Sequence, residues 1–274
     1  MARPKKSLGQ NFLVDANLQR KIVAAVEPQP EDVILEIGPG TGAITQHLAG
    51  HVRHLTAVEL DHALADQLSR QFAGRADVRI IEGDALELDP GSIATDPASL
   101  KVVGNIPYNI TTPLLFHLLS RNWRPAHIVL MLQKEVADRL LAGPGTAPYG
   151  ALSVGVQTVA RADRLFHVSR NAFRPVPRVD SSVVRIVPIR PFPLSRQEEE
   201  DLRALTRAAF GWRRKQLQRT LRSATPYALE TADIGRIESS TGIQLERRPE
   251  SLAPAEFVRL AAALRQAGRP RNTE

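Results

Sequence analysis

Short apolar runs alternate with segments of helical character along the first two-thirds of the chain. The apolar runs are typical of strands in a buried sheet, and they are VILEI (33–37), LTAVEL (55–60), the start of VRIIEGDAL (78–86), the start of KVVGNIPY (101–108), HIVLML (127–132) and SSVVRIVPI (181–189). Helical spacing is found over 17–26, 43–51, 62–72 and 133–143. This alternation predicts an α/β fold with a doubly wound, mostly parallel sheet.

Two capping patterns indicate where further helices begin. Thr112 before Pro113 predicts a helix start, with the hydroxyl as N-cap and proline at the first helical position. Ser195 and Glu198 fit a capping box, and the pattern from there to the end is helical.

The length of the chain allows two domains. Its 274 residues are enough for one α/β domain and a small second domain. Residues 188–194 hold three prolines and are interpreted as a linker. We therefore expect an α/β domain over 1–190 and a helical domain over 195–274.

Composition excludes several classes of function. The chain has no cysteine, so disulfides, thiolate metal sites and a cysteine nucleophile are excluded, and we expect no metal. The absence of cysteine also fits a reducing cytoplasm, where we expect the protein. No apolar run reaches the roughly 18 residues of a membrane span, so we expect no membrane partner. The net charge of +7 favours a polyanionic partner. Seven basic residues and no acidic residue fall within 203–222.

A glycine-rich loop follows the first predicted strand. Gly38 and Gly40 lie between this strand and a helix, where glycines let the backbone approach a ligand closely. Glu59 ends the next strand, where a carboxylate can accept both ribose hydroxyls of a nucleoside. With Ala43 the loop also satisfies a dinucleotide fingerprint, so an NAD-type oxidoreductase stays open, as does a purely structural turn.

Asp84 ends the third predicted strand. A carboxylate there can accept a hydrogen bond from an adenine amine, although an N-cap role is equally compatible. Glu59 and Asp84 close successive parallel strands, on the edge where such sheets bind ligands. Together they indicate a nucleoside-containing cofactor.

The turn Asn105-Ile106-Pro107-Tyr108 closes the fourth predicted strand. The N6 amine of adenine is a poor nucleophile because its lone pair is delocalised into the ring. An asparagine oxygen and a backbone carbonyl can accept its two N–H bonds and localise that pair. Proline fixes the turn, and an aromatic neighbour can stack on the base. An ordinary turn is the alternative for such a tetrapeptide alone.

Several longer stretches resemble one family. The chain resembles the small-subunit (16S) ribosomal RNA adenine N6,N6-dimethyltransferases over nearly its whole length. The matching stretches are SLGQNFLVD (7–15), LEIGPGTGAIT (35–45), VELD (58–61), GNIPYNITTPLLFHLL (104–119), MLQKEVADRL (131–140), YGALSV (149–154), FRPVPRVDSSVVR (173–185) and AFGWRRKQLQRTL (209–221). The resemblance implies a Rossmann-like class I methyltransferase domain that uses S-adenosyl-L-methionine.

The resemblance also implies roles for individual residues. Seven residues would bind the cofactor, and they are Asn11, Leu13, Gly38, Gly40, Glu59, Asp84 and Asn105. Asn105 and the Pro107 carbonyl would hold the target N6, and Tyr108 and Phe173 would sandwich the base. Arg213, Arg214 and Lys215 would contact RNA phosphates; a solvated helix face is the alternative for them.

The implied substrate is 16S rRNA or a precursor of the small ribosomal subunit. Members of this family add two methyl groups to each of two adjacent adenines in a hairpin loop near the RNA's 3′ end, and we expect a monomer. The nearest competing hypothesis is the large-subunit (23S) rRNA adenine methyltransferase of the macrolide-resistance type. A mitochondrial transcription factor of the same fold and an NAD-dependent dehydrogenase also stay open.

Overall fold

The computed structural model describes residues 10–107, 110–191, 193–224 and 226–268. The chain divides into two compact units. One comprises Met1–Ala137 and Ala160–Pro188, and the other Asp138–Val159 and Ile189–Glu274. No helix among the described residues is long and apolar enough to cross a membrane.

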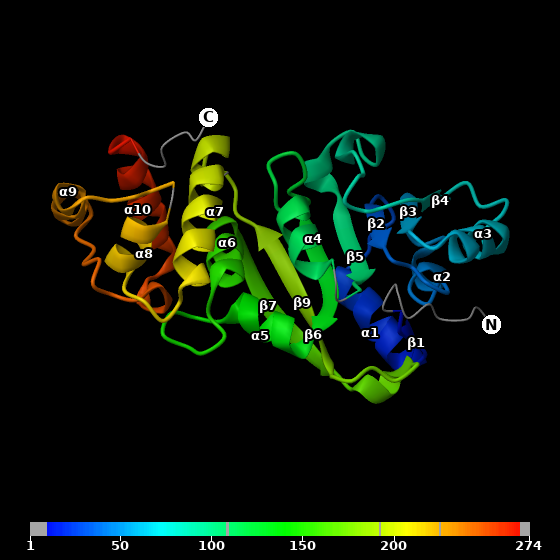
Figure 1. The fold of residues 1–274 in the computed structure, drawn as a ribbon. Helices are drawn as coiled ribbons and strands as arrows, with labels where there is room; N and C mark the ends of the chain where they lie inside the picture. Colours follow the sequence, from blue (N-terminus) through cyan, green and yellow to red (C-terminus); the bar gives the residue numbers. More distant parts are fainter. Residues whose placement is uncertain (1–9, 108–109, 192, 225, 269–274) are drawn as a thin grey trace. The chain divides into compact units, whose positions relative to one another are not determined.

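The first unit is built on a seven-stranded sheet with the order β4-β3-β2-β5-β6-β9-β7 (Figure 1). Its strands are β2 (Val33–Ile37), β3 (His54–Glu59), β4 (Val78–Glu82), β5 (Lys101–Asn105), β6 (His127–Gln133), β7 (Ala160–Val168) and β9 (Ser181–Pro188). The strands from β4 to β6 are mutually parallel, whereas β9 is antiparallel to β6 and to β7. This confirms the doubly wound, mostly parallel sheet.

Helices cover both faces of this sheet, which is why its strands are almost continuously apolar. Neighbouring side chains on one strand point to opposite faces, yet Ile34 and Leu35 are both fully buried, as are Val102 and Val103. The helices are α1 (Ala16–Val26), α2 (Thr45–Leu48), α3 (His62–Gln71), α4 (Thr111–Leu118) and α5 (Lys134–Leu141), the last of which runs into the second unit. Helix α1 packs against β5 and β6, and α3 packs against β3 and β4.

Two helix predictions were wrong in detail. The helix expected over 43–51 is confined to α2, because Gly42 closes a turn onto the Pro39 carbonyl (2.9 Å) and Gly50 takes a positive φ. Thr112 is not an N-cap, since α4 already begins at Thr111 and no side chain caps it. Pro113 is thus the third helical residue, where a missing N–H still costs no intrahelical bond.

A short antiparallel pair that the sequence did not predict joins distant segments. Strand β1 (Phe12–Leu13) pairs with β8 (Phe173–Arg174), with Phe12 opposite Arg174 and Leu13 opposite Phe173. The Val14 N–H extends the pairing to the Ala172 carbonyl at 2.9 Å. The N-terminal segment is thereby fixed against the first unit.

The second unit is helical. Its helices are α6 (Ala151–Val159), α7 (Arg196–Gly211), α8 (Leu217–Ser223), α9 (Thr231–Thr241) and α10 (Pro254–Gln266) (Figure 1). The predicted capping box at the start of α7 is confirmed, because the Ser195 N–H donates to the Glu198 carboxylate (2.7 Å) and Ser195 Oγ accepts from the Glu198 N–H (3.3 Å). Helices α6 and α10 both pack against α7.

The second unit begins earlier in the chain than the expected domain over 195–274. Residues 138–159 belong to it, although they were expected in the domain over 1–190. The Tyr149 side chain gives the physical reason. It is fully buried in the helical core, its hydroxyl donates to the Leu252 carbonyl at 2.8 Å, and its ring meets that of Phe210 edge-on.

Candidate functional site

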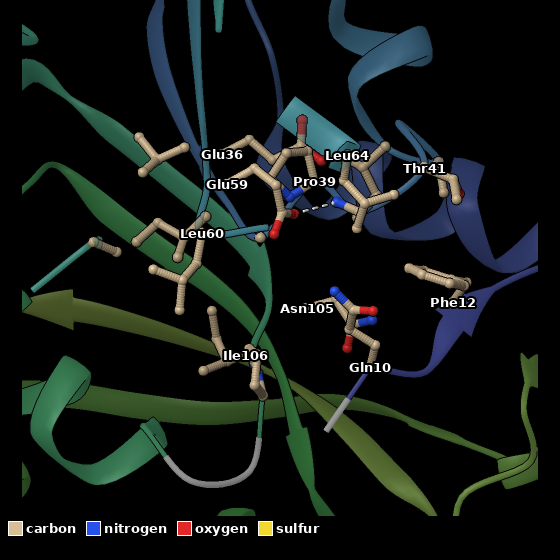
Figure 2. Close-up of a pocket in the computed structure, with 18 of the residues that line it drawn as sticks. Gln10, Phe12, Glu36, Pro39, Thr41, Glu59, Leu60, Leu64, Asn105 and Ile106 are labelled. Atoms are coloured by element: carbon tan, nitrogen blue, oxygen red, sulfur yellow. Dashed lines mark hydrogen bonds between the residues drawn. The ribbon is translucent and has the colours of Figure 1, made fainter. Parts of the chain in front are cut away.

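A pocket opens at the carboxyl ends of β2, β3, β4 and β5 (Figure 2). This edge contains a topological switch point, because β2 has β3 on one side and β5 on the other, and such points bind ligands in doubly wound sheets. The pocket holds about 1170 Å³ of space, including the part that is open to solvent. Its lining includes nearly all the residues predicted for cofactor and base, namely Asn11, Leu13, Gly38, Gly40, Glu59, Asp84, Asn105, Pro107 and Phe173.

Tyr108, predicted to stack on the target base, lies outside the described residues. Phe173 is described, and only 1% of its surface is exposed. It belongs to the apolar core of the first unit and also borders the pocket. Sandwiching a base therefore stays a prediction for both residues, and for Phe173 it would need a local movement.

The backbone of the glycine loop requires its glycines. Gly38 and Gly40 have φ values of 66° and 60°, which favour glycine, and the Gly38 N–H donates to the Val58 carbonyl at 3.0 Å. A Cβ on Gly40 would lie 3.2 Å from the Phe12 ring. The loop therefore lies directly against the N-terminal segment that carries Asn11 and Leu13.

Glu59 connects this loop to the end of β3. Its two carboxylate oxygens accept from the Gly40 N–H (3.0 Å) and the Asp61 N–H (3.0 Å), and Figure 2 shows the side chain in the pocket wall. Burial raises the pKa of the Glu59 carboxyl, while these two N–H bonds act in the opposite direction. The carboxylate thus holds the glycine loop in place and also lines the pocket. The sequence analysis did not predict the first of these two roles.

Asp84 combines the two interpretations that the sequence left open. Its Oδ1 accepts from the Leu86 N–H at 2.9 Å, which is the turn-capping role. Its side chain also lines the pocket. Within the described residues no donor contacts Oδ2, so that oxygen can accept a bond from a ligand amine.

Glu36 is a pocket residue that the sequence analysis missed. It is the last residue but one of β2, is 2% exposed, and its Oε2 has no hydrogen-bond partner among the described residues. Burial raises the pKa of its carboxyl from 4.5 to about 7, and the nearby Glu59 charge contributes in the same direction. A glutamate inside the apolar run VILEI was the available signal.

Replacing Glu36 with glutamine should change how stability depends on pH. Between pH 4.5 and about 7 the unfolded glutamate is ionised while the folded one keeps its proton, so wild-type stability falls as pH rises. Glutamine does not titrate. The stability of E36Q relative to wild type should therefore rise by on the order of 1–3 kcal/mol across this range and stay level above it. Urea unfolding of cofactor-free protein from pH 4.5 to 8.5 measures this, and a constant difference would contradict it.

The turn after β5 brings Asn105 beside the N-terminal segment. The Asn105 Nδ2 donates to the Asn11 carbonyl at 3.2 Å, which leaves its Oδ1 without a donor among the described residues. A Cβ on Gly104 would lie 2.6 Å from the Ile37 carbonyl, so glycine is needed before Asn105 for β2 and β5 to approach. Figure 2 shows Asn105 across the pocket from Glu59.

The Pro107 carbonyl is the second acceptor predicted for the target amine. It already accepts from the Ile110 N–H (3.3 Å) and from the Thr111 hydroxyl (3.2 Å). A hydroxyl can rotate away when another donor arrives. Asn105 Oδ1 is therefore the more accessible of the two predicted acceptors.

The predicted RNA-contacting cluster follows α7 in the second unit. Arg214 and Lys215 are exposed, and their side chains make no ion pair or hydrogen bond within the described part of the chain. Arg213 is different, because its guanidinium donates to the Ala147 (2.7 Å) and Thr146 (3.2 Å) carbonyls. The structure thus distinguishes two exposed cations from one that is tied to its own unit.

Comparison with known proteins adds independent information. A family model described as ribosomal RNA adenine dimethylase matches residues 1–264. Ribosomal RNA small subunit methyltransferase A from Pseudomonas fluorescens is 44% identical over 268 residues, which is 98% of this chain and 96% of that protein.

Two solved structures resemble most of the chain. A dimethyladenosine transferase from Plasmodium falciparum has a TM-score of 0.76 at 24% identity, over 94% of this chain and 98% of that one. The 23S rRNA methyltransferase ErmE has a TM-score of 0.68 at 25% identity, over 93% of this chain and 100% of that one.

Proposed function

Because this chain belongs to the ribosomal RNA adenine dimethylase family, we infer that it transfers methyl groups from S-adenosyl-L-methionine to N6 of adenine in ribosomal RNA. The observation that carries this conclusion is the 44% identity to a small-subunit methyltransferase over 98% of the chain. The geometry of the pocket supports it, since Asn105 faces the glycine loop across the ligand space.

The residues of the pocket fit this cofactor. The glycine loop presents its backbone to the methionine end, and Glu59 and Asp84, at the ends of neighbouring strands, suit the ribose and the adenine amine. The unpartnered oxygen of Glu36 adds a buried acceptor in the same wall. When bound, the cofactor supplies a methyl group on a positively charged sulfur, which is an electrophile.

The Asn105 side chain would act on the target amine. Its Oδ1 accepts an N–H bond from N6, and the Pro107 carbonyl accepts the other. These bonds localise the nitrogen lone pair and grow stronger as N6 becomes positively charged. The methylated amine is acidic and gives its proton to water, so no general base is needed before transfer. The bond between Asn105 Nδ2 and the Asn11 carbonyl would hold the side-chain amide in place and leave Oδ1 available to the substrate.

We propose 16S rRNA in a precursor of the small subunit as the substrate, with two adjacent adenines in a hairpin loop near the 3′ end each methylated twice. Relatives with 44–45% identity carry the small-subunit name, whereas the 23S enzyme is 25% identical. We also propose that the protein acts as a cytoplasmic monomer. The helical domain would hold RNA while the α/β domain carries out the transfer.

Mapping dimethyladenine in ribosomal RNA tests this function. Cells lacking the gene should lose N6,N6-dimethyladenine from small-subunit RNA and regain it with a wild-type copy. Loss from large-subunit RNA instead would assign the protein to the macrolide-resistance type. Calorimetry should show binding of S-adenosyl-L-methionine, and binding of NAD in its place would overturn the cofactor.

The exposed cations after α7 should contribute to RNA affinity through phosphates. The double variant R214A/K215A is expected to bind small-subunit rRNA more weakly and to lower the magnitude of the log–log salt slope by about 1.4–1.8. Filter binding at several salt concentrations measures both quantities.

A charge-matched control distinguishes the loss of phosphate contacts from the effect of a lower net charge on the protein. The variant R70A/R236A also removes two positive charges, at arginines paired with Asp66 and Asp233. It should leave the salt slope nearly unchanged. If R214A/K215A behaves like this control, the predicted cluster is only a solvated surface.

A further inference from the structure

Trp212 is the most exposed large apolar side chain in the part of the chain that the structure describes. It directly follows α7, and 62% of its surface is in solvent. Single exposed apolar side chains are common on proteins and by themselves indicate no function. Trp212 differs from such isolated side chains in two respects. The turn that contains it is held in place by several contacts, and basic side chains lie beside it in the same turn.

The turn that carries Trp212 is held by the residues just before and just after that tryptophan. Phe210 directs its ring inward, with ring centroids 5.6 Å from Phe257 and 6.0 Å from Tyr149. Arg213 then ties the turn to the Thr146 and Ala147 carbonyls. One residue therefore points into the core and another is bonded to its own unit, while Trp212 between them faces solvent.

Backbone hydrogen bonds further along the chain also hold the turn. The Lys215 N–H donates to the Trp212 carbonyl at 2.8 Å and closes the turn. The Leu217 and Gln218 N–H groups donate to the Arg247 (3.0 Å) and Leu245 (2.8 Å) carbonyls. A ligand that contacts Trp212 thus meets backbone that is already ordered, so binding loses little entropy there.

The charged side chains of this turn favour a nucleic acid as the partner. Arg214 and Lys215 in this turn are exposed, and no acidic residue occurs in the sequence over 203–222. One exposed acidic residue, Glu246, lies between the two residues whose carbonyls accept from Leu217 and Gln218. An aromatic ring among cations is the combination that binds unpaired nucleic acid, because the ring stacks on a base while the cations pair with neighbouring phosphates. A duplex offers phosphates but no open base face to such a ring.

We propose that Trp212 stacks on an unpaired base of ribosomal RNA while Arg214 and Lys215 bind the adjacent phosphates. Arg213 is then a positioning residue that holds the turn, not a phosphate contact. The inference rests on the proposed function. It adds that the helical unit binds a single-stranded segment of the RNA, through a base as well as through phosphates.

Affinity and salt dependence together test the stacking. W212A should bind protein-free small-subunit rRNA about 5- to 150-fold more weakly. Its salt slope should match that of wild type, because no phosphate contact is removed. W212F should retain most of the affinity. The control V187A, which trims an exposed apolar side chain on β9, should bind like wild type.

Tryptophan fluorescence reports the contact directly. The chain has two tryptophans, and Trp123 is only 3% exposed, so a ligand-dependent change in emission reports Trp212. Oligouridylate should quench the emission of wild type but not that of W212F. An RNA duplex of equal length should quench it much less at equal occupancy.

Three results would overturn the proposal. The first is that W212A binds protein-free rRNA with wild-type affinity, and the second is that Trp212 emission does not respond to oligouridylate. The third is that W212A loses affinity for intact small subunits but not for protein-free rRNA, which would mean that Trp212 contacts a ribosomal protein. Methyl transfer by wild type is measured in parallel. If the wild-type protein methylates small-subunit RNA while W212A binds rRNA with wild-type affinity, the stacking proposal is wrong and the proposed function stands. If the wild-type protein transfers no methyl groups, the proposed function is wrong.

Discussion

Replacing Asn105 with alanine should slow methyl transfer by about 100- to 1,000-fold, by analogy with removal of one oxyanion-hole donor. Asn105 Oδ1 faces the pocket without a donor in the described part of the chain, because Nδ2 is bonded to the Asn11 carbonyl. Its bond to N6 would strengthen as positive charge develops there. An interaction that grows in the transition state affects the chemical step more than binding.

RNA affinity should be nearly unchanged in N105A, since phosphate contacts elsewhere supply most of it. Cofactor affinity should fall modestly, because Asn105 lines the pocket proposed for the cofactor. The measurement is single-turnover transfer from labelled S-adenosyl-L-methionine to small-subunit particles, with both at saturation.

Asn171 offers a matched control for this experiment. It is exposed in the short turn before β8 and does not line the pocket. N171A should transfer methyl groups at the wild-type rate. If N105A also stays within a few-fold of wild type, the turn after β5 is not the catalytic centre.

Replacing Glu59 with alanine should weaken S-adenosyl-L-methionine binding by about 10- to 150-fold, or 1.5–3 kcal/mol. The variant removes the acceptor proposed for the ribose hydroxyls. It also leaves the Gly40 and Asp61 N–H groups without their partner, so the glycine loop loses its tie to β3. Both effects act on the cofactor and neither acts on the RNA face, so calorimetry should show the loss while rRNA affinity is retained.

Glu82 provides the control for Glu59. The two residues are direct neighbours across β3 and β4, but Glu82 is exposed and does not line the pocket. E82A should bind the cofactor as wild type does. Unchanged affinity in a folded E59A variant would mean that the ribose lies elsewhere.

The sheet could be predicted because its strands carry a strong local signal. Burial on both faces makes each strand a continuous apolar run, as Ile34 and Leu35 illustrate, and the polar residue that ends a parallel strand must fall on one edge. Glu59, Asp84 and Asn105 could therefore be placed at one edge from position alone, and the structure brings all three to one pocket.

Features that depend on long-range contacts could not be predicted in this way. The pairing of β1 with β8 involves two residues on each side, too few for a periodic pattern. Likewise, nothing local assigns 138–159 to the helical unit; the buried Tyr149 does so through its bond to Leu252. Arg213 belongs to the same class, because a cation that bonds to its own backbone looks like any other cation in a sequence.

The β1–β8 pairing has a consequence for how the protein is made. Strand β1 directly follows Asn11, which lies in the pocket wall. Because Phe12 pairs with Arg174, β1 can pair only after a segment that is translated about 160 residues later has been made. Closing so long a loop is slow, and chain ends that wait for distant partners form late. On the ribosome, the β2–β5 part of the sheet can assemble first, and the pocket acquires its N-terminal wall only after residue 174 has emerged. A nascent chain that ends before residue 174 therefore lacks the strand partner that holds this wall of the proposed cofactor pocket.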